Sequence, residues 1–296
     1  MSVSENWMPA EFAKFEQNPQ IQKTGMLKLV LHKDEEKKKT IVLHQYSKAP
    51  LLTQKALYYD SDNPSMAYLF LMSSSGGVLQ GDRYEIKISL GQNAIANITT
   101  QGATRIYKME SDYASQNIEL EIGDDAYLEM LPDQIIPYAN SRYFQHVNLS
   151  VGKNSTVVYS EIISPGRAAR GELFDYEMCY LRFVAKNSVG MKFTDISRLE
   201  PGADKFANTA ILGGNSVLGT MYVITEKKNH TISEQIRSIL ENSEPLCGFS
   251  FLPGDSGIVI RILGTSPEQI KAIFVQIIKI IRNQILGSTL GELRKT

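Results

Sequence analysis

Apolar and polar residues alternate with period two through much of the chain, and short turns interrupt the alternating segments at regular intervals. Three turns share one pattern: Leu90-Gly91-Gln92-Asn93-Ala94, Ile122-Gly123-Asp124-Asp125-Ala126 and Val151-Gly152-Lys153-Asn154-Ser155. A fourth copy, Ala185-Lys186-Asn187-Ser188, lacks the glycine. The Asn or Asp positions 93, 125, 154 and 187 are 32, 29 and 33 residues apart.

This repeat predicts the architecture. Glycine and Asn or Asp adopt left-handed turn conformations that other residues resist, so each copy indicates a tight corner between two strands. Recurrence at this spacing is typical of stacked coils, in which each layer buries its apolar face on the next. We therefore predict a mainly β fold with an irregular β-helical, stacked-coil architecture. A β-sandwich with hairpins at the same turns is the alternative.

Two α-helices are expected outside this core, one near 231–241 and one near 267–286. The second begins with an N-cap, a proline and a capping-box glutamine at Ser266, Pro267 and Gln269, and Gly287 can end it. Its apolar residues recur at helical spacing: Ile270, Ile273, Phe274, Ile277, Ile278, Ile281 and Ile285. Thr231-Ile232-Ser233-Glu234 starts the first helix in the same way. Both apolar faces are expected to pack on the core, and a partner groove is the alternative.

Composition limits the domain organisation and the partners. The chain has 296 residues, 43% of them hydrophobic, and no linker rich in Pro, Gly or Ser divides it. We expect an N-terminal extension over residues 1–20 and a single domain over residues 21–296. The 31 basic and 32 acidic residues nearly cancel, so nucleic acid is not expected as a partner.

The cysteines and the apolar segments indicate a compartment. Cys179 and Cys247 are 68 residues apart and lack C-x-x-C spacing, which argues against a zinc knuckle and a disulfide framework. The first 20 residues lack the basic and apolar regions of a signal peptide, and no uncharged stretch is long enough to cross a membrane. We expect a soluble, cytoplasmic protein without a membrane partner.

Gly76 and Gly81 have the spacing of a phosphate-binding loop, but the residues that follow do not fit one. Asp82-Arg83 stands where that loop needs Lys followed by Ser or Thr. Residues 84–90 alternate with period two, so the turn opens a strand and offers no helix N-terminus to a phosphate. A nucleotide site is therefore not expected here.

No catalytic constellation is found in the sequence. The four histidines, His32, His44, His146 and His230, are scattered and lack the spacing of a zinc hydrolase. There is no G-x-S-x-G elbow, and neither cysteine has a base nearby in the sequence. We expect a protein that is not an enzyme, with no catalytic residues and no tightly bound cofactor.

Glu161 lies inside an apolar strand, between Val157-Val158-Tyr159 and Ile162-Ile163. A lone buried carboxylate is costly, so Glu161 is expected to have a partner, and Arg167 or Arg170 past the Pro165-Gly166 turn is the nearest choice. A buried ion pair that pins the turn is one interpretation. The other is a carboxylate-lined passage, which could let a divalent metal ion through without holding it.

Four motifs lie in a fixed order between residues 69 and 175. They are Gly76-Gly77-x-x-x-Gly81-Asp82, the run from Thr99 to Tyr107, Leu128-Glu129-Met130-Leu131-Pro132, and Tyr159 to Ile163 leading to Gly166-Arg167 and Gly171-Glu172. Together they resemble the urease accessory proteins of the UreD family, called UreH in helicobacters. Weaker similarity extends from about residue 25 to the C-terminus.

This resemblance implies a β-helical fold with two helices and a urease maturation factor. Such a protein docks on apo-urease, recruits a helical UreF-like partner and through it a UreG-like GTPase, and assists nickel delivery as scaffold and conduit. Transient passage residues would be Glu161, Glu172 and Asp82. Structural or interface residues would be Gly76, Gly77, Gly81, Thr99, Thr100, Gln101, Tyr107, Pro132 and Arg167.

Two other functions stay open at this point. One is a β-solenoid carbohydrate-active enzyme, and the other is an adaptor of the urease complex without a metal passage. The Thr99-Thr100-Gln101 run suits a polar strand ladder as well as a functional surface.

Overall fold

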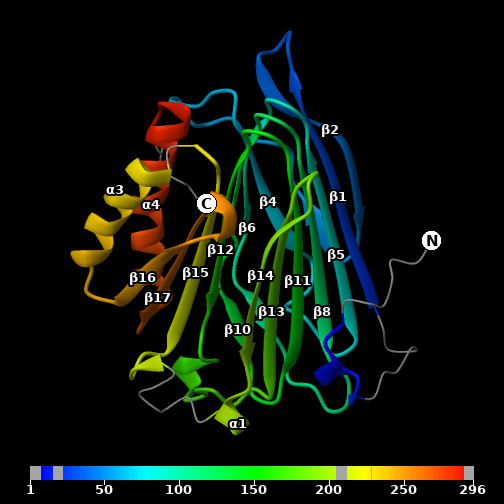
Figure 1. Cartoon of the computed structure of the whole chain (residues 1–296). Coiled ribbons are helices and arrows are strands. Elements are labelled where there is room, and N and C mark those ends of the chain that lie inside the picture. Colours follow the sequence, from blue (N-terminus) through cyan, green and yellow to red (C-terminus); the bar gives the residue numbers. More distant parts are fainter. Residues whose placement is uncertain (1–7, 16–22, 205–211, 228, 290–296) are drawn as a thin grey trace.

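Two β-sheets that face each other form the body of the computed structural model, which describes residues 8–15, 23–204, 212–227 and 229–289 (Figure 1). The first, sheet A, has seven strands in the order β14-β13-β11-β8-β5-β1-β2. Their bounds are β1 (Lys23–Asp34), β2 (Lys39–Lys48), β5 (Asp82–Leu90), β8 (Ala114–Ile122), β11 (Arg142–Val151), β13 (Met178–Lys186) and β14 (Met191–Leu199).

The second sheet, sheet B, has ten strands. Eight follow the order β16-β17-β15-β12-β9-β6-β4-β3. The other two lie off this path: β10 pairs with β12 and with β7. Their bounds are β3 (Leu51–Thr53), β4 (Ala67–Ser73), β6 (Ile95–Thr100), β7 (Thr104–Ile106), β9 (Tyr127–Met130), β10 (Ile135–Pro137), β12 (Thr156–Ile163), β15 (Val217–Ile224), β16 (Leu246–Phe251) and β17 (Gly257–Gly264).

The chain passes back and forth between the sheets, and each passage lays a parallel strand beside the previous one. Strands β1, β5, β8, β11 and β13 are parallel neighbours in sheet A. Strands β4, β6, β9 and β12 are parallel neighbours in sheet B. A sandwich built from hairpins would pair consecutive strands antiparallel. The predicted mainly β, stacked-coil architecture is therefore confirmed.

Three copies of the sequence repeat form the corners between the sheets. Asn93, Asp125 and Asn154 have φ angles of 57°, 55° and 53°, in the left-handed region. Successive corners are bonded to each other, from Asn93 N to Asp124 O at 3.0 Å and from Asp125 N to Lys153 O at 2.9 Å. A Cβ on Gly152 would lie 2.6 Å from Asp124 N. The glycine is required because each corner rests directly on its neighbour.

The fourth copy is a turn of a different kind. β13 runs in register with β11 as far as Lys186, which lies opposite Ser150. The chain then turns at Asn187 and returns as β14, antiparallel to β13 within sheet A. The interpretation of this copy as another corner of the stack is wrong, because the chain does not cross to sheet B there.

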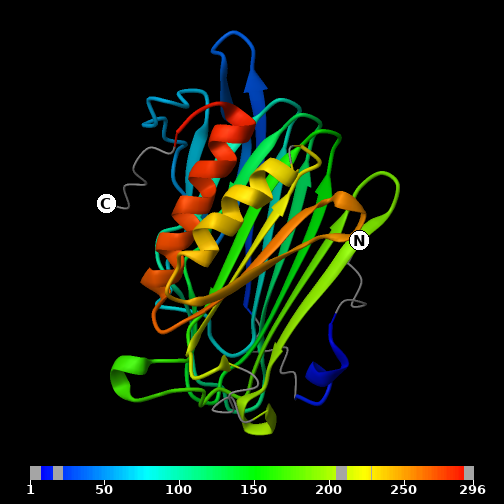
Figure 2. The same cartoon turned by 60° about the vertical axis from the view of Figure 1, so that its left-hand side comes forward.

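Both predicted helices are present and lie on the outer face of sheet B (Figure 2). They are α3 (Asn229–Glu241) and α4 (Pro267–Leu286), and a short helix, α1, spans Pro201–Asp204. Ser266 caps α4 by accepting a hydrogen bond from Gln269 N, and Gly287 ends the helix in the left-handed conformation. Six of the seven predicted apolar residues of α4 are buried, which confirms that this face belongs to the core: Ile270, Ile273, Phe274, Ile277, Ile278 and Ile281.

Residues 8–15 of the expected N-terminal extension lie against the outer face of sheet A. Phe12 is fully buried there among Tyr113, Phe144 and Tyr180. The rest of residues 1–20 lies outside the described residues. The division at residue 20 stays a prediction.

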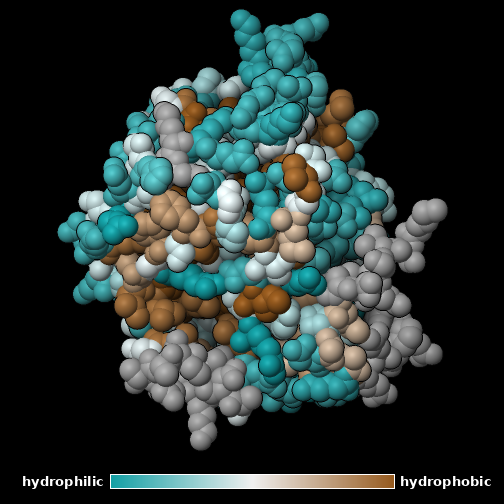
Figure 3. Space-filling model, in the orientation of Figure 1, coloured by the Kyte–Doolittle hydropathy of each residue, from teal (hydrophilic) through white to brown (hydrophobic). Residues whose placement is uncertain are grey.

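Sheet B ends at β16, whose outer edge faces solvent. Leu246 and Phe251 of this strand are exposed. Figure 3 shows apolar side chains gathered at the lower left, over the region of β16 and β17. None of the helices among the described residues is long and apolar enough to cross a membrane.

Candidate functional site

A cavity of about 400 Å³ lies between the two sheets. It is lined by parts of three segments of sheet B and its loops, residues 71–78, 100–105 and 130–135, and by side chains from the inner strands. The cavity forms where two strands of sheet B are interrupted. β6 ends at Thr100 and β7 begins at Thr104, and β9 ends at Met130 and β10 begins at Ile135. The chain between these strands leaves the ladder and forms loops that we call the mouth loops, residues 101–103 and 131–134.

The threonines of the Thr-Thr-Gln run hold the two mouth loops together. Thr99 Oγ1 donates a hydrogen bond to Leu131 O at 2.6 Å, and Thr100 Oγ1 accepts one from Asp133 N at 2.8 Å. Gln101 is exposed and lines the cavity. Thr99 and Thr100 therefore form a polar ladder to the next coil, and Gln101 borders the opening.

The glycine-rich turn forms another wall of the cavity. Val78 pairs with the strand beside it through bonds to Arg105 O at 2.7 Å and from Tyr107 N at 2.9 Å. A Cβ on Gly77 would lie 2.4 Å from Tyr107 Cε2 and 2.6 Å from Arg105 O. Only glycine fits this close approach. Gly76 also lines the cavity.

Asp82 closes the same turn and lies outside the lining of the cavity. Its carboxylate accepts hydrogen bonds from Leu79 N at 2.8 Å and from the Tyr84 hydroxyl at 2.7 Å. Gly81, with φ of 80°, gives the turn its left-handed residue. Asp82 is buried and serves the turn that leads into β5.

Glu161 lies inside the cavity on β12, opposite the inner face of sheet A. Its Oε1 accepts a hydrogen bond of 2.8 Å from Gln145 Nε2 of β11. Gln145 in turn accepts hydrogen bonds from Gln116 Nε2 and the Tyr143 hydroxyl, both at 3.3 Å. Burial raises the pKa of Glu161 to about 7, although hydrogen bonds from Tyr159 and Gln145 oppose this shift. Near neutral pH the carboxyl group therefore exchanges between its acid and its carboxylate forms.

The expected ion pair of Glu161 with Arg167 or Arg170 is wrong. Arg167 binds Glu172 instead, with its Nε 2.7 Å from Glu172 Oε2, and its guanidinium lies 4.3 Å from the centre of the Tyr138 ring. The two side chains point in different directions. Glu161 points between the sheets, whereas the chain after Ser164 turns outward at Gly166, which has φ of 136°. The hydrogen bonds from Arg167 lower the pKa of Glu172.

The structure brings together only part of the predicted site. Of the three passage carboxylates, Glu161 lines the cavity, whereas Asp82 and Glu172 do not. Of the predicted structural or interface residues, Gly76, Gly77, Thr100, Gln101 and Pro132 line it. Tyr107 packs against Tyr138 outside the lining, with ring centres 5.0 Å apart and the rings tilted by 47°.

Sequence reasoning missed several residues of the cavity. Gln145 occupies an inward position of an alternating strand, between Tyr143 and Val147, and a polar residue at an apolar position is a usable signal. Asp133 and Tyr159 also line the cavity. Their role depends on which strands face each other, which no local pattern gives.

The lining of the cavity offers few groups that could bind a metal ion. Among the described residues, no group of three or more His, Cys, Asp or Glu side chains could hold a metal ion. The ionisable residues most relevant to a cation in the lining are Asp133 and Glu161, with Arg105 at the same cavity. Carboxylate, amide and hydroxyl oxygens bind divalent ions weakly when so few converge.

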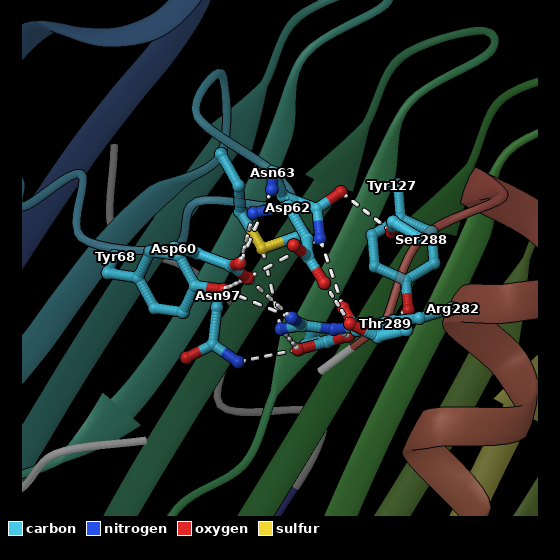
Figure 4. A network of polar contacts seen from close by, with 11 residues as sticks. Asp60, Asp62, Asn63, Tyr68, Asn97, Tyr127, Arg282, Ser288 and Thr289 are labelled. Atoms are coloured by element: carbon cyan, nitrogen blue, oxygen red, sulfur yellow. Dashed lines mark hydrogen bonds and ion pairs between the residues drawn. The ribbon is translucent and has the colours of Figure 1, made fainter. Parts of the chain in front are cut away.

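A second buried polar cluster lies on the outer face of sheet B, beneath α4 (Figure 4). Arg282 of α4 is fully buried and binds Glu129 of β9 and Asp60. Tyr127 donates a hydrogen bond to Glu129 at 2.7 Å, and Asn97 donates another at 2.6 Å. Sequence reasoning missed the burial of Arg282. Its partners satisfy the fully buried guanidinium.

Comparison with known proteins gives the family. The family model described as UreD urease accessory protein matches residues 23–295. A urease accessory protein UreD of Cenarchaeum symbiosum is 40% identical over 276 residues, which covers 92% of this chain and 96% of the relative. A urease accessory protein UreD 2 of Brucella suis is 32% identical over 293 residues, covering 95% and 96%. One of Streptomyces griseus is 31% identical over 261 residues, covering 87% and 89%. The chain belongs to the UreD family of urease accessory proteins.

Proposed function

We propose that this protein assists the maturation of urease as both scaffold and metal conduit. It docks on apo-urease, recruits a UreF-like helical protein and through it a UreG-like GTPase, and lets nickel pass toward the urease active site. Family membership supports the role in maturation. It also favours this function over the carbohydrate-active enzyme, which rested on the coil architecture alone.

One observation supports the conduit: motifs that are distant in the sequence line the same cavity. The Gly76-Gly77 turn, the Thr100-Gln101 run, Pro132 and Glu161 are scattered over more than 80 residues, and all line the same space. Three of the four family motifs form its walls, and the fourth supplies its buried carboxyl group. A function located at this cavity accounts for why these particular segments carry the resemblance.

The chemistry of the cavity suits an ion that must leave again. Ionised Glu161 and the oxygens around it attract a divalent cation, and nickel accepts carboxylate and water oxygens. Because the pKa of Glu161 lies at about 7, the carboxyl group can take up a proton as the ion moves on. Tight binding would need more ligands than the cavity offers. We therefore expect the isolated chain to bind nickel weakly.

Energy for the transfer would come from the GTPase partner. The turn from Gly76 to Gly81 leads into strand β5, and Asp82 occupies the place of a phosphate-binding lysine. The chain itself therefore positions its partners and provides the path for nickel.

The test is co-expression with a urease operon that lacks its own copy of this chain. Wild type, Glu161→Gln and the matched control Glu234→Gln, an exposed residue of α3, are compared. Two quantities are measured: recovery of the complex on urease by pull-down, and the nickel content of the urease produced. We expect Glu161→Gln to form the complex but lower the nickel content, and Glu234→Gln to match wild type.

Other outcomes would select other functions. Full nickel content with Glu161→Gln would contradict a passage at Glu161 and favour an adaptor without a metal path. Loss of the complex together with nickel would indicate that Glu161 only supports the fold. Unchanged urease nickel in the absence of the whole chain would contradict the role in maturation.

A further inference from the structure

One mouth loop of the cavity is tied to the outer helix α4. Lys271, in the second turn of α4, donates hydrogen bonds to Asp133 Oδ1 at 2.8 Å and to Gln134 Oε1 at 2.6 Å. These residues are 138 and 137 positions apart in the sequence. Helix α4, on the outer face of sheet B, therefore binds the loop that borders the cavity between the sheets.

The other end of α4 is fixed to the same segment of sheet B. Arg282 binds Glu129 of β9, four residues before Asp133. At about 1.5 Å of rise per helical residue, Lys271 and Arg282 lie about 16 Å apart along α4. At about 3.3 Å per residue of extended chain, Glu129 and Asp133 lie up to about 13 Å apart. The helix thus holds β9 and the loop after it at two points.

The two points of attachment differ in burial. Arg282 and Glu129 are both 0% exposed, so that end resists exchange with water. The Lys271 side chain is 36% exposed and that of Asp133 is 12% exposed, so water can compete for this pair. The attachment at Lys271 can therefore open while the helix stays folded.

The backbone of the mouth loop is bonded to the neighbouring segment 98–104, and Leu131 N donates to Ile98 O at 2.8 Å while Leu131 O accepts from Thr99 Oγ1. Asp133 N is bonded to Thr100 Oγ1, and Gln134 O accepts from Thr104 N at 2.9 Å. Both partners flank the other mouth loop, residues 101–103, rather than the interior of a strand. The loop is thus attached to one neighbouring segment and to α4, and loss of the α4 attachment makes its local opening more populated.

We propose that Lys271 is a positioning residue that keeps the mouth loop 131–134 closed over the cavity, so that release of Lys271 admits solvent and solutes. Lys271 acts through Asp133 and Gln134. The inference deepens the proposed function, and its relevance to metal transfer rests on that function. Its test measures access to the cavity in the isolated full chain, whereas failure of the proposed function shows only in urease nickel content.

The experiment places a thiol inside the cavity. Met130 lines the cavity and is 1% exposed, so Met130→Cys, made in a Cys247→Ser background, reports access. Native Cys179 is fully buried outside the lining and reports global opening. Modification of each thiol by methyl methanethiosulfonate is followed by peptide mass spectrometry. The variants are Lys271→Met, Lys271→Arg, Asp133→Asn and the control Lys279→Met, which is exposed on the same helix.

We expect Lys271→Met and Asp133→Asn each to raise the modification rate at position 130 about tenfold, with Cys179 unchanged, because a local opening becomes more populated. Lys271→Arg should restore most of the protection, and Lys279→Met should leave the rate unchanged. The inference is overturned if Lys271→Met leaves the rate at position 130 unchanged, if Lys279→Met raises it equally, or if Cys179 becomes reactive in parallel. Should Lys271→Met fail to fold, Asp133→Asn decides by the same criteria.

Discussion

Arg282 of α4 and Glu129 of β9 form a fully buried, bidentate ion pair. Arg282 Nε lies 2.6 Å from Glu129 Oε1, and Arg282 Nη2 lies 2.6 Å from Glu129 Oε2. Asp60 adds a second carboxylate at 2.9 Å from Arg282 Nη1. The single guanidinium thus neutralises only one of two buried carboxylates, and hydroxyl and amide donors of Tyr68, Tyr127 and Asn97 stabilise the remaining charge.

Removal of this guanidinium should weaken the fold. Arg282→Met leaves Glu129 and Asp60 buried without a counter-ion, and we expect a loss of about 3 to 5 kcal/mol in the free energy of unfolding. Urea denaturation measures it, with Lys279→Met on the exposed face of α4 as control. A loss below about 1 kcal/mol would mean that water reaches the cluster.

Gly77 should not tolerate a side chain. Gly77→Val places carbon atoms against the Tyr107 ring and Arg105 O, and we expect a cost of about 1 to 3 kcal/mol and less soluble protein. Gly248→Val is the matched control, because a Cβ at Gly248 has no heavy atom within 4 Å. If both variants melt at the wild-type temperature, the close approach at Gly77 does not exist in solution.

Glu161 should make stability depend on pH. Its pKa is raised from 4.5 to about 7 in the folded chain, so the folded state binds the proton more strongly than the unfolded state. The resulting stabilisation is fully present below pH 4.5 and is lost as the pH rises toward about 7, by up to a few kcal/mol. We expect wild type to lose stability relative to Glu161→Gln between pH 5 and about pH 8. A difference between the two that stays constant over this range would show that Glu161 is solvated.

The isolated chain should neither bind nor hydrolyse GTP. The turn at Gly76 presents no helix N-terminus, and the Asp82 carboxylate would repel a phosphate. Calorimetric titration with GTP and magnesium should give no binding heat. Micromolar affinity would contradict this argument.

Elements that depend only on neighbouring residues could be predicted from local sequence patterns. The corner residues at positions 93, 125 and 154 were predicted because only a few residue types adopt left-handed backbone angles. The bounds 267–286 of α4 were predicted because Ser266 and Gly287 cap the helix with their own atoms.

Contacts across the fold could not be predicted in this way. Gln145 and Glu161 meet because β11 and β12 lie in opposite sheets at the same level, and nothing near either residue specifies that level. Arg167 was closer in sequence and was the wrong choice. Arg282 shares the apolar face of α4 with Ile278, four residues earlier, and that position was the available signal for its burial.

The corner glycines also bear on where the stack of coils ends. A further coil needs a glycine where its corner would rest on Gly152, because any Cβ in such a position meets backbone. In β13, Lys186 lies opposite Ser150, and the chain turns at Asn187 before it reaches the level of Gly152, so no fourth corner forms and the chain returns as β14 in the opposite direction. The last parallel edge of sheet A is thereby covered by an antiparallel strand. In a protein whose layers could in principle be added without end, this return strand caps the stack and stops its elongation.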